Sequence, residues 1–171
     1  MEQDNSTPTP AGADGQDQKA IGIRVLAQYV KDISFENPTG PNSLLPPPAG
    51  TPQPTIEVTV DVAAKRLADV DFESELRINA KSLRGTDTLF LVELVFAGVF
   101  RIENAPPEML EPILLIEAPR QLFPFARRIV ADVTRDGGFL PLLIDPVDFA
   151  TLYRQQRERL QANPPAPTAL A

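Results

Sequence analysis

Two segments in the middle of the chain alternate between apolar and polar positions. Residues 56–62 place Ile56, Val58, Val60 and Val62 between Glu57, Thr59 and Asp61. Residues 72–81 repeat the pattern, with an apolar or small side chain at every second position from Phe72 to Ala80. A period of two is typical of a β-strand with one buried face. Residues 65–70 between the segments predict a short, hairpin-like connection.

Two longer strands are predicted on either side of this pair. We expect the first over 21–35, with a break near Val30 where the alternation changes register, and the second over 86–102, with a bulge or bend at Gly98. The proline-rich loop 37–54 exceeds the ~12–15 residues usual for an unstructured connection. It is either a solvated linker or an extended crossover whose leucines, Leu44 and Leu45, line a groove.

The C-terminal part of the chain has helical periodicity. Residues 108–133 predict a helix interrupted by prolines and ended by Gly137 and Gly138, and a second helix is predicted from Asp145 as N-cap with Pro146 as its first residue. The interrupting prolines are Pro112, Pro119 and Pro124. One apolar stripe follows the helical period: Leu122, Phe125, Ala126, Ile129 and Val133. Four strands followed by two helices predict an α+β fold, a four-stranded antiparallel sheet with two helices packed on one face.

The predicted strand 86–102 is apolar on both faces. One face carries Phe90, Val92, Leu94 and Phe96, and the other carries Leu89, Leu91, Glu93 and Val95. One layer of helices can cover only one face of a sheet. We therefore favour an oligomer interface or a binding surface on one face over the alternative that both lie beneath the chain's own helices.

Composition removes many kinds of chemistry from consideration. The 171 residues include no cysteine and no histidine, so we expect no disulfide, no Cys/His metal site and no imidazole base. The net charge of −7 disfavours nucleic acid and anionic lipid as partners. Acid/base pairs such as Asp132 with Arg135, or Asp145 with Asp148, are explained as surface ion pairing and helix capping, and no phosphate-binding glycine motif occurs. We expect neither an enzyme nor a bound cofactor.

The two ends of the chain are small, polar and rich in proline. This composition predicts disordered tails over 1–20 and 161–171 around one folded domain, residues 21–160. The first 20 residues have neither the basic nor the apolar region of a signal peptide, and no apolar stretch approaches the ~18 residues of a membrane span. We expect a cytoplasmic protein without direct insertion into a membrane.

Four segments together resemble the SecB family of protein-export chaperones. They are KDISFENP (31–38), FLVELVFAGVF (90–100), LFPFARRIVADVTRDGGF (122–139) and PLLIDPVDFATLY (141–153), and their order and spacing also match. The resemblance covers about residues 21–160 and implies an ATP-independent cytoplasmic holdase. Such a chaperone binds unfolded precursor proteins and delivers them to the motor ATPase SecA. It further implies a homotetramer, a dimer of dimers, of subunits with a four-stranded sheet and two helices.

The resemblance also implies roles for individual residues. By motif, the family's SecA contacts map onto Asp32, Glu36, Leu91 and Glu93. The tetramer interface maps onto strand and helix positions: Val92, Leu94, Phe96, Leu122, Phe125 and Ile129. Carboxylates on a flat sheet face suit a basic partner through charge steering, although most strand carboxylates are simply solvated.

A holdase needs apolar contact that does not depend on one client sequence. The candidate groove residues are Leu44, Leu45, Phe139, Leu140, Phe149, Leu152 and Tyr153. For Phe149 and Leu152 the alternative is ordinary helix packing. The chain departs from the family pattern in two places, since the loop 37–54 has no aromatic residue and the C-terminal end is basic through Arg154, Arg157 and Arg159.

Two alternatives to the export function stay open at this point. A carrier of small apolar ligands would use the same apolar surfaces as a closed pocket. A specialised SecB-like chaperone would instead serve a toxin–antitoxin pair.

Overall fold

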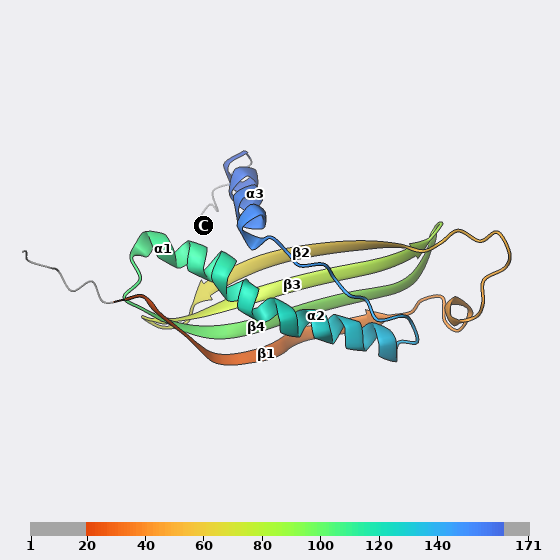
Figure 1. Cartoon of the computed structure of the whole chain (residues 1–171), viewed down its shortest axis with the longest axis horizontal. Coiled ribbons are helices and arrows are strands. Elements are labelled where there is room, and N and C mark those ends of the chain that lie inside the picture. Colours follow the sequence, from red (N-terminus) through yellow and green to blue (C-terminus); the bar gives the residue numbers. More distant parts are fainter. Residues whose placement is uncertain (1–19, 163–171) are drawn as a thin grey trace, which may run out of the picture.

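The computed structural model describes residues 20–162, which form one four-stranded antiparallel sheet covered by helices on one face (Figure 1). The strands are β1 (Gly22–Glu36), β2 (Thr55–Arg66), β3 (Asp71–Arg84) and β4 (Asp87–Glu103), in the order β1-β4-β3-β2. The predicted fold class is confirmed. The predicted tails fall almost wholly outside the described residues, although the last helix continues to Ala162.

The loop 37–54 connects the two edges of this sheet. β1 lies at one edge and β2 at the other, so the chain must cross the end of the sheet between them. Figure 1 shows the loop extending beyond that end. It contains one turn of 3-10 helix, η1 (Asn42–Leu44), and is otherwise irregular.

β1 carries two one-residue insertions relative to β4. Leu26 and Lys31 have no partner in the register, because Val25 pairs with Phe100 and Ala27 with Val99, and Val30 pairs with Phe96 and Asp32 with Val95. An inserted residue moves the following side chains to the opposite face. The predicted break near Val30 is confirmed, and it directs Phe35 toward the helices and Asp32 and Glu36 toward the uncovered face.

The helical layer is one nearly continuous rod rather than an interrupted helix. It consists of α1 (Pro107–Pro112), the π-helical segment η2 (Ile113–Glu117) and α2 (Ala118–Asp136). Pro119 has no N–H for the Leu114 carbonyl, and the buried Ser74 hydroxyl donates to that carbonyl at 3.0 Å instead. The predicted interruption is confirmed at Pro112 and Pro119, which bound the π-helical segment, and is wrong at Pro124, which lies within α2. The wider turn and the side-chain donor compensate for the missing backbone donor, so the rod continues through the segment.

Gly98 is a point of close approach and not a bulge. It pairs in register with Gln28 on one side and Ser74 on the other. A Cβ at this position would lie 2.7 Å from Leu122 Cδ2 and 2.8 Å from Phe100 Cε2. The glycine thus lets α2 pack closely on β4, which is another reason for a glycine within a strand.

The core lies between the sheet and the rod. Phe90, Val92, Leu94 and Phe96 of β4 are buried against α2, whose Leu122 is fully buried. The assignment of Val92, Leu94, Phe96 and Leu122 to a tetramer interface is wrong, because these side chains are enclosed within one subunit. Phe125 is 48% exposed and Ile129 is half-buried. Of the six assigned residues, only these two have exposed side-chain surface with which to contact another subunit.

The last helix, α3 (Phe149–Ala162), stands off the sheet above β2 (Figure 1). Its N-cap is Asp148 and not Asp145, since Asp148 Oδ1 accepts hydrogen bonds from the backbone N–H groups of Ala150 and Thr151, both at 3.1 Å. Both aspartates fit the capping pattern. A helix that begins after Asp148 buries Phe149 against Phe123 of α2. This packing explains why Asp148, rather than Asp145, is the N-cap.

Candidate functional site

Three phenylalanines meet where the rod ends above the sheet. The Phe90 and Phe139 rings lie 4.9 Å apart between centroids, and Phe35 lies 6.1 Å from Phe90 and 6.3 Å from Phe139. Aromatic rings at these separations attract one another beyond the area that they bury. The cluster joins β1, β4 and the chain that follows α2, although it does not use the loop leucines.

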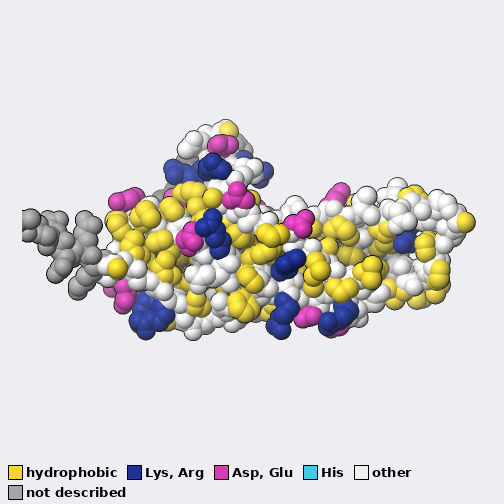
Figure 2. Space-filling view, viewed as in Figure 1, with side chains coloured by type: hydrophobic (Ala, Val, Ile, Leu, Met, Phe, Trp, Pro, Cys, Tyr) yellow, Lys and Arg dark blue, Asp and Glu magenta, His cyan; other side chains and the backbone are white. Residues whose placement is uncertain are grey.

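An open groove of about 330 Å³ lies beside this aromatic cluster. We call it the end groove. It is lined by Ser43, Pro54, Ile56, Ser82, Arg84, Leu89, Phe90, Phe139, Leu140, Pro141 and Leu142. Leu140 is 90% exposed at its rim. Figure 2 shows hydrophobic side chains exposed along the helix-covered side of the molecule, with charged side chains between them.

The end of α2 fixes one wall of the end groove. Gly138 has a positive φ of 89°, which ends the helix, and a Cβ on Gly137 would lie 2.2 Å from Phe35 Cζ. The buried Thr134 hydroxyl accepts the Leu142 N–H at 2.9 Å, and the Thr134 carbonyl accepts the Phe139 N–H at 3.1 Å. These bonds hold residues 139–142 against the rod, so the wall is built before any ligand binds.

The structure divides the predicted client-groove residues into two groups. Phe139 and Leu140 line the end groove, and exposed Leu44 lies near it against Gly138, with Leu45 exposed beside it. The other three are on α3. Phe149 is 1% exposed and packs in the core, so its assignment to a groove is wrong; Leu152 packs partly on the core, and Tyr153 lies beneath the Arg157 guanidinium.

Several groove residues escaped the sequence analysis. Ile56 and Phe90 are predicted as strand residues, but nothing in their alternation separates a groove from a core. Arg84 and Leu89 lie next to the β3–β4 turn, where the register shifts between Ser82 and Leu83. The one available signal was the clustering of phenylalanines at positions that antiparallel pairing brings to the same end of the sheet.

The face of the sheet opposite the rod is uncovered in the subunit. Asp32, Glu36, Leu91 and Glu93 lie together on it, because Glu36 pairs with Leu91, Ser34 with Glu93 and Asp32 with Val95. Paired residues of antiparallel strands share a face. The three carboxylates are exposed, and none takes part in an ion pair among residues 20–162. We call these four residues the acidic patch.

Two buried carboxylates lie farther along the uncovered face. Burial alone would raise the pKa of Glu73, but hydrogen bonds from Lys65, Tyr29 and Lys31 lower it to about 2. The Lys65 bond measures 2.7 Å and the Lys31 bond 3.1 Å. Lys31 also bonds Glu75, and this bond, ahead of the opposing effect of burial, lowers the pKa of Glu75. The inserted Lys31 is thereby anchored to β3, and this anchor fixes the register that forms the acidic patch.

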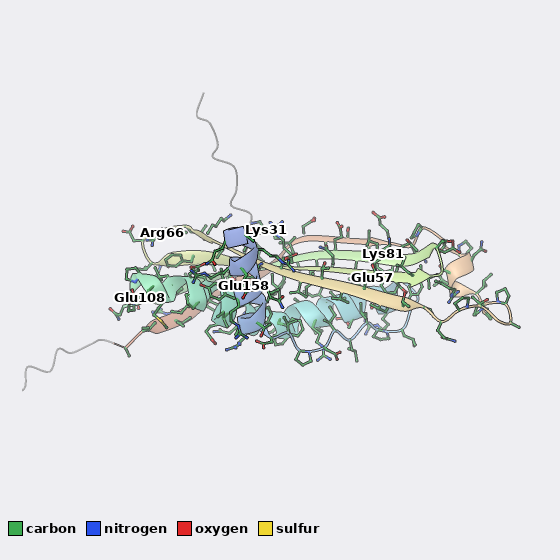
Figure 3. All side chains as sticks on the ribbon, turned by 90° about the horizontal axis from the view of Figure 1, so that it is seen from above. Lys31, Glu57, Arg66, Lys81, Glu108 and Glu158 are labelled. Atoms are coloured by element: carbon green, nitrogen blue, oxygen red, sulfur yellow. The ribbon has the colours of Figure 1, made fainter. Side chains whose placement is uncertain are left out.

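A second, larger cavity of about 760 Å³ opens between the end of β2, α1 and α3. Its apolar floor includes Phe72, Leu110 and Leu114, and its rim carries Lys65, Arg66 and Arg159. Arg66 lies near the end of the molecule where α1 begins, whereas Glu57 and Lys81 lie in the other half of the sheet (Figure 3). Within residues 20–162 no group of three acidic side chains could hold a metal ion, and no helix is long and apolar enough to cross a membrane.

A family model described as preprotein translocase subunit SecB matches residues 16–160. The chain belongs to the SecB family. It is 54% identical over 144 residues to the protein-export protein SecB of Parvibaculum lavamentivorans, covering 84% of each chain. It is 51% identical over 161 residues to SecB of Rhodopseudomonas palustris, covering 94% of this chain and 96% of the other. These relatives establish a protein-export chaperone of the SecB family.

A solved structure supports the fold assignment. The SecB-like chaperone of Mycobacterium tuberculosis, in complex with a ChAD peptide from the HigA1 antitoxin, superposes with a TM-score of 0.59 at 15% identity. The match covers 73% of this chain and 90% of that one. At this identity the likeness shows the shared SecB fold only.

Proposed function

We propose that this SecB-family chain is an ATP-independent cytoplasmic holdase that binds unfolded precursor proteins in the end groove and delivers them to SecA. The observation that carries the proposal is the open apolar groove of about 330 Å³ beside the Phe35–Phe90–Phe139 cluster, with Leu140 90% exposed at its rim. An exposed apolar surface on a preformed wall marks a site for an apolar partner.

Apolar contact suits a partner whose sequence varies. Each apolar side chain that a client buries gains about 25 cal/mol per Å² removed from water, whatever the order of its residues. The outer strand β2 adds unpaired backbone groups next to the groove, because its other edge faces no strand within residues 20–162. An extended client segment can pair with such an edge through main-chain hydrogen bonds, independently of its sequence.

The acidic patch is the proposed SecA-docking surface. On the uncovered face of the sheet, Glu36 lies opposite the half-buried Leu91, Glu93 lies two residues along β4, and Asp32 lies farther along, opposite Val95. A charged rim around an apolar contact speeds association with a partner of opposite charge and selects it. Because the end groove opens on the helix-covered side, client and SecA would bind opposite faces of the subunit.

Self-association into a dimer of dimers is the third part of the proposal. Large apolar side chains are exposed along the edge strand β1: Ile23, Leu26, Tyr29, Val30 and Ile33, with Ile21 exposed directly before it. Phe125 on α2 adds a second exposed apolar position. A long, exposed, apolar edge strand tends to pair with another chain. A second copy of this chain is therefore the expected partner for it.

Suppression of aggregation tests the holdase function. The wild-type protein should reduce light scattering when an unfolded client is diluted from denaturant, at about one tetramer per client. Leu140→Gln removes an exposed apolar contact from the groove rim and should weaken suppression severalfold without lowering stability. Leu143→Gln is the matched control, since Leu143 is 64% exposed three residues away and does not line the groove. Equal suppression by both variants would place client binding elsewhere.

A carrier of small apolar ligands is the second candidate function, and the cavity of about 760 Å³ favours it. An apolar fluorescent dye that binds once per subunit, with no effect of the protein on client aggregation, would support the carrier. The specialised role in a toxin–antitoxin system has support only from the peptide in the distant M. tuberculosis structure. Relatives about half identical over most of the chain are protein-export proteins, which favours export.

A further inference from the structure

Charged side chains form bands along the strands on the uncovered face of the sheet. The register places one residue of each strand in a row across this face. Two of these rows have the same order of acid, apolar residue, base and acid, from β1 through β4 and β3 to β2. They are Glu36, Leu91, Lys81 and Glu57, and Asp32, Val95, Arg77 and Asp61. The acidic patch on β1 and β4 is therefore bordered on β3 by two bases, Arg77 and Lys81, which we call the basic stripe.

Lys81 is the more available charge of the basic stripe. It forms no ion pair within residues 20–162, although Glu57 lies opposite it on β2. Figure 3 shows Glu57 and Lys81 in the same half of the sheet. Arg77 is exposed, but its guanidinium donates to Glu75 at 2.9 Å, and this carboxylate partly neutralises it. The charge of Lys81 therefore acts on any partner that approaches this part of the face.

A basic group of a partner above Leu91 experiences two opposite influences. Neighbouring strands are about 4.8 Å apart, so Glu36 on β1 and Lys81 on β3 lie at similar distances from Leu91 on β4. Along this row the attraction and the repulsion nearly cancel above β4, and both favour a displacement toward β1. These separations are shorter than the Debye length of about 8 Å at physiological ionic strength, so salt screens neither effect completely.

We propose that the basic stripe confines a basic partner to the β1–β4 side of the uncovered face, and that Lys81 is the residue that determines this position. The inference rests on the proposed docking of SecA at the acidic patch. A partner fits when its basic groups form a narrow band above β1 and β4, with neutral or acidic groups beyond that band. Like charges placed opposite one another penalise a wrong partner, so the stripe adds selectivity that the carboxylates alone do not supply.

Removal of the Lys81 charge tests the repulsion. Lys81→Gln should bind SecA about two- to fivefold more tightly than the wild type in calorimetry, because a like charge next to the patch is lost. Lys81→Arg should bind like the wild type, since the charge is kept. Arg24→Gln is the control for net charge, because Arg24 is an exposed base at the far end of the same face, opposite Arg101. It should change the affinity by less than about twofold, because it lies well beyond the Debye length from the patch.

Photo-crosslinking from the row between the two charged rows locates the partner. In this row Ser34 on β1 and Asn79 on β3 flank Glu93. A photoreactive amino acid at position 34 should give a strong product with SecA, and the same group at position 79 should give little. Adding Lys81→Gln should increase the product from position 79, because the partner is no longer confined. Thermal unfolding verifies that each variant is folded.

The outcomes separate this inference from the proposed docking surface. If Lys81→Gln leaves the affinity unchanged, or if position 79 of the wild type crosslinks as strongly as position 34, the inference is overturned. The acidic patch then stands as long as Asp32→Lys weakens binding. An equal gain in affinity from Arg24→Gln also overturns the inference, because net charge then explains the effect. If neither Asp32→Lys nor Glu93→Lys weakens binding to SecA, the docking surface is itself wrong, and the inference with it.

Discussion

At the scale of single residues, the buried carboxylate Glu73 connects the stability of the sheet to pH. It lies on the uncovered face with bonds from Tyr29, Lys31 and Lys65, and its pKa is lowered from the ordinary 4.5 to about 2. A carboxylate with a lowered pKa stabilises the folded state when it is ionised. This contribution is complete above about pH 4.5 and is lost as the pH falls from 4.5 toward 2.

Glu73→Gln should therefore reduce the free energy of unfolding at pH 7, because three partners lose a charged acceptor. Between pH 4.5 and 2 the variant should lose less stability than the wild type does. Denaturant unfolding at fixed protein concentration measures both effects. Glu57→Gln is the control on the same face, with no ion pair in the described part of the chain. If the free energy of unfolding falls equally with pH in wild type and Glu73→Gln, Glu73 is not the group that couples stability to pH.

At the scale of elements, the alternation of side chains predicted all four strands to within a few residues. The alternation also located one insertion in β1, because the apolar positions near Val30 change from odd-numbered to even-numbered residues. The pattern could not say which apolar face of β4 the rod covers, so it did not exclude the interface role that the family resemblance implied for Val92 and Leu94, which are buried beneath the rod. Coverage depends on which side the rod packs, and that depends on contacts such as Gly98 with Leu122.

The site was less predictable than the elements. Phe139 and Leu140 follow a helix end that the glycines mark, so their place in an exposed turn could be anticipated. Two aspartates in a DPVD sequence both fit an N-cap, and only the burial of Phe149 decides between them. The end groove as a whole could not be found from the sequence, because five separate segments line it: residues 43, 54–56, 82–84, 89–90 and 139–142.

The edge strand β1 allows a matched test of assembly. Val30 of β1 and Val58 of β2 are exposed to a similar degree, 43% and 37%, on the two opposite edges of the sheet. Val30→Lys should reduce the mass measured by light scattering after gel filtration to below four chains, because an edge charge opposes strand pairing. Val58→Lys should leave the mass unchanged. The reverse result would assign the interface to β2.

At the scale of the whole molecule, the fold separates three surfaces. The end groove lies on the helix-covered side, the acidic patch on the uncovered side, and the apolar edge along β1. This separation would let a bound client, SecA and a second subunit occupy one chain together. Release of the client then needs no nucleotide on this protein, because a partner that binds one state better shifts the equilibrium.

Charge reversal in the acidic patch tests the docking surface. Asp32→Lys and Glu93→Lys should each weaken binding to SecA, measured by calorimetry, by about five- to tenfold, and should leave suppression of client aggregation unchanged. Glu108→Lys is the control, because Glu108 is an exposed acid on α1 at the end of the molecule opposite Glu57 and Lys81 (Figure 3). Unchanged SecA binding in both patch variants would show that SecA docks elsewhere.

The central claim is that unfolded clients lie in the end groove, and photo-crosslinking tests it most directly. A photoreactive amino acid in place of Leu140 should form a covalent product with an unfolded client, and none with the same client after folding. The same group in place of Leu143, exposed but outside the groove, should give little product. Strong crosslinking from position 143 and none from position 140 would contradict the account.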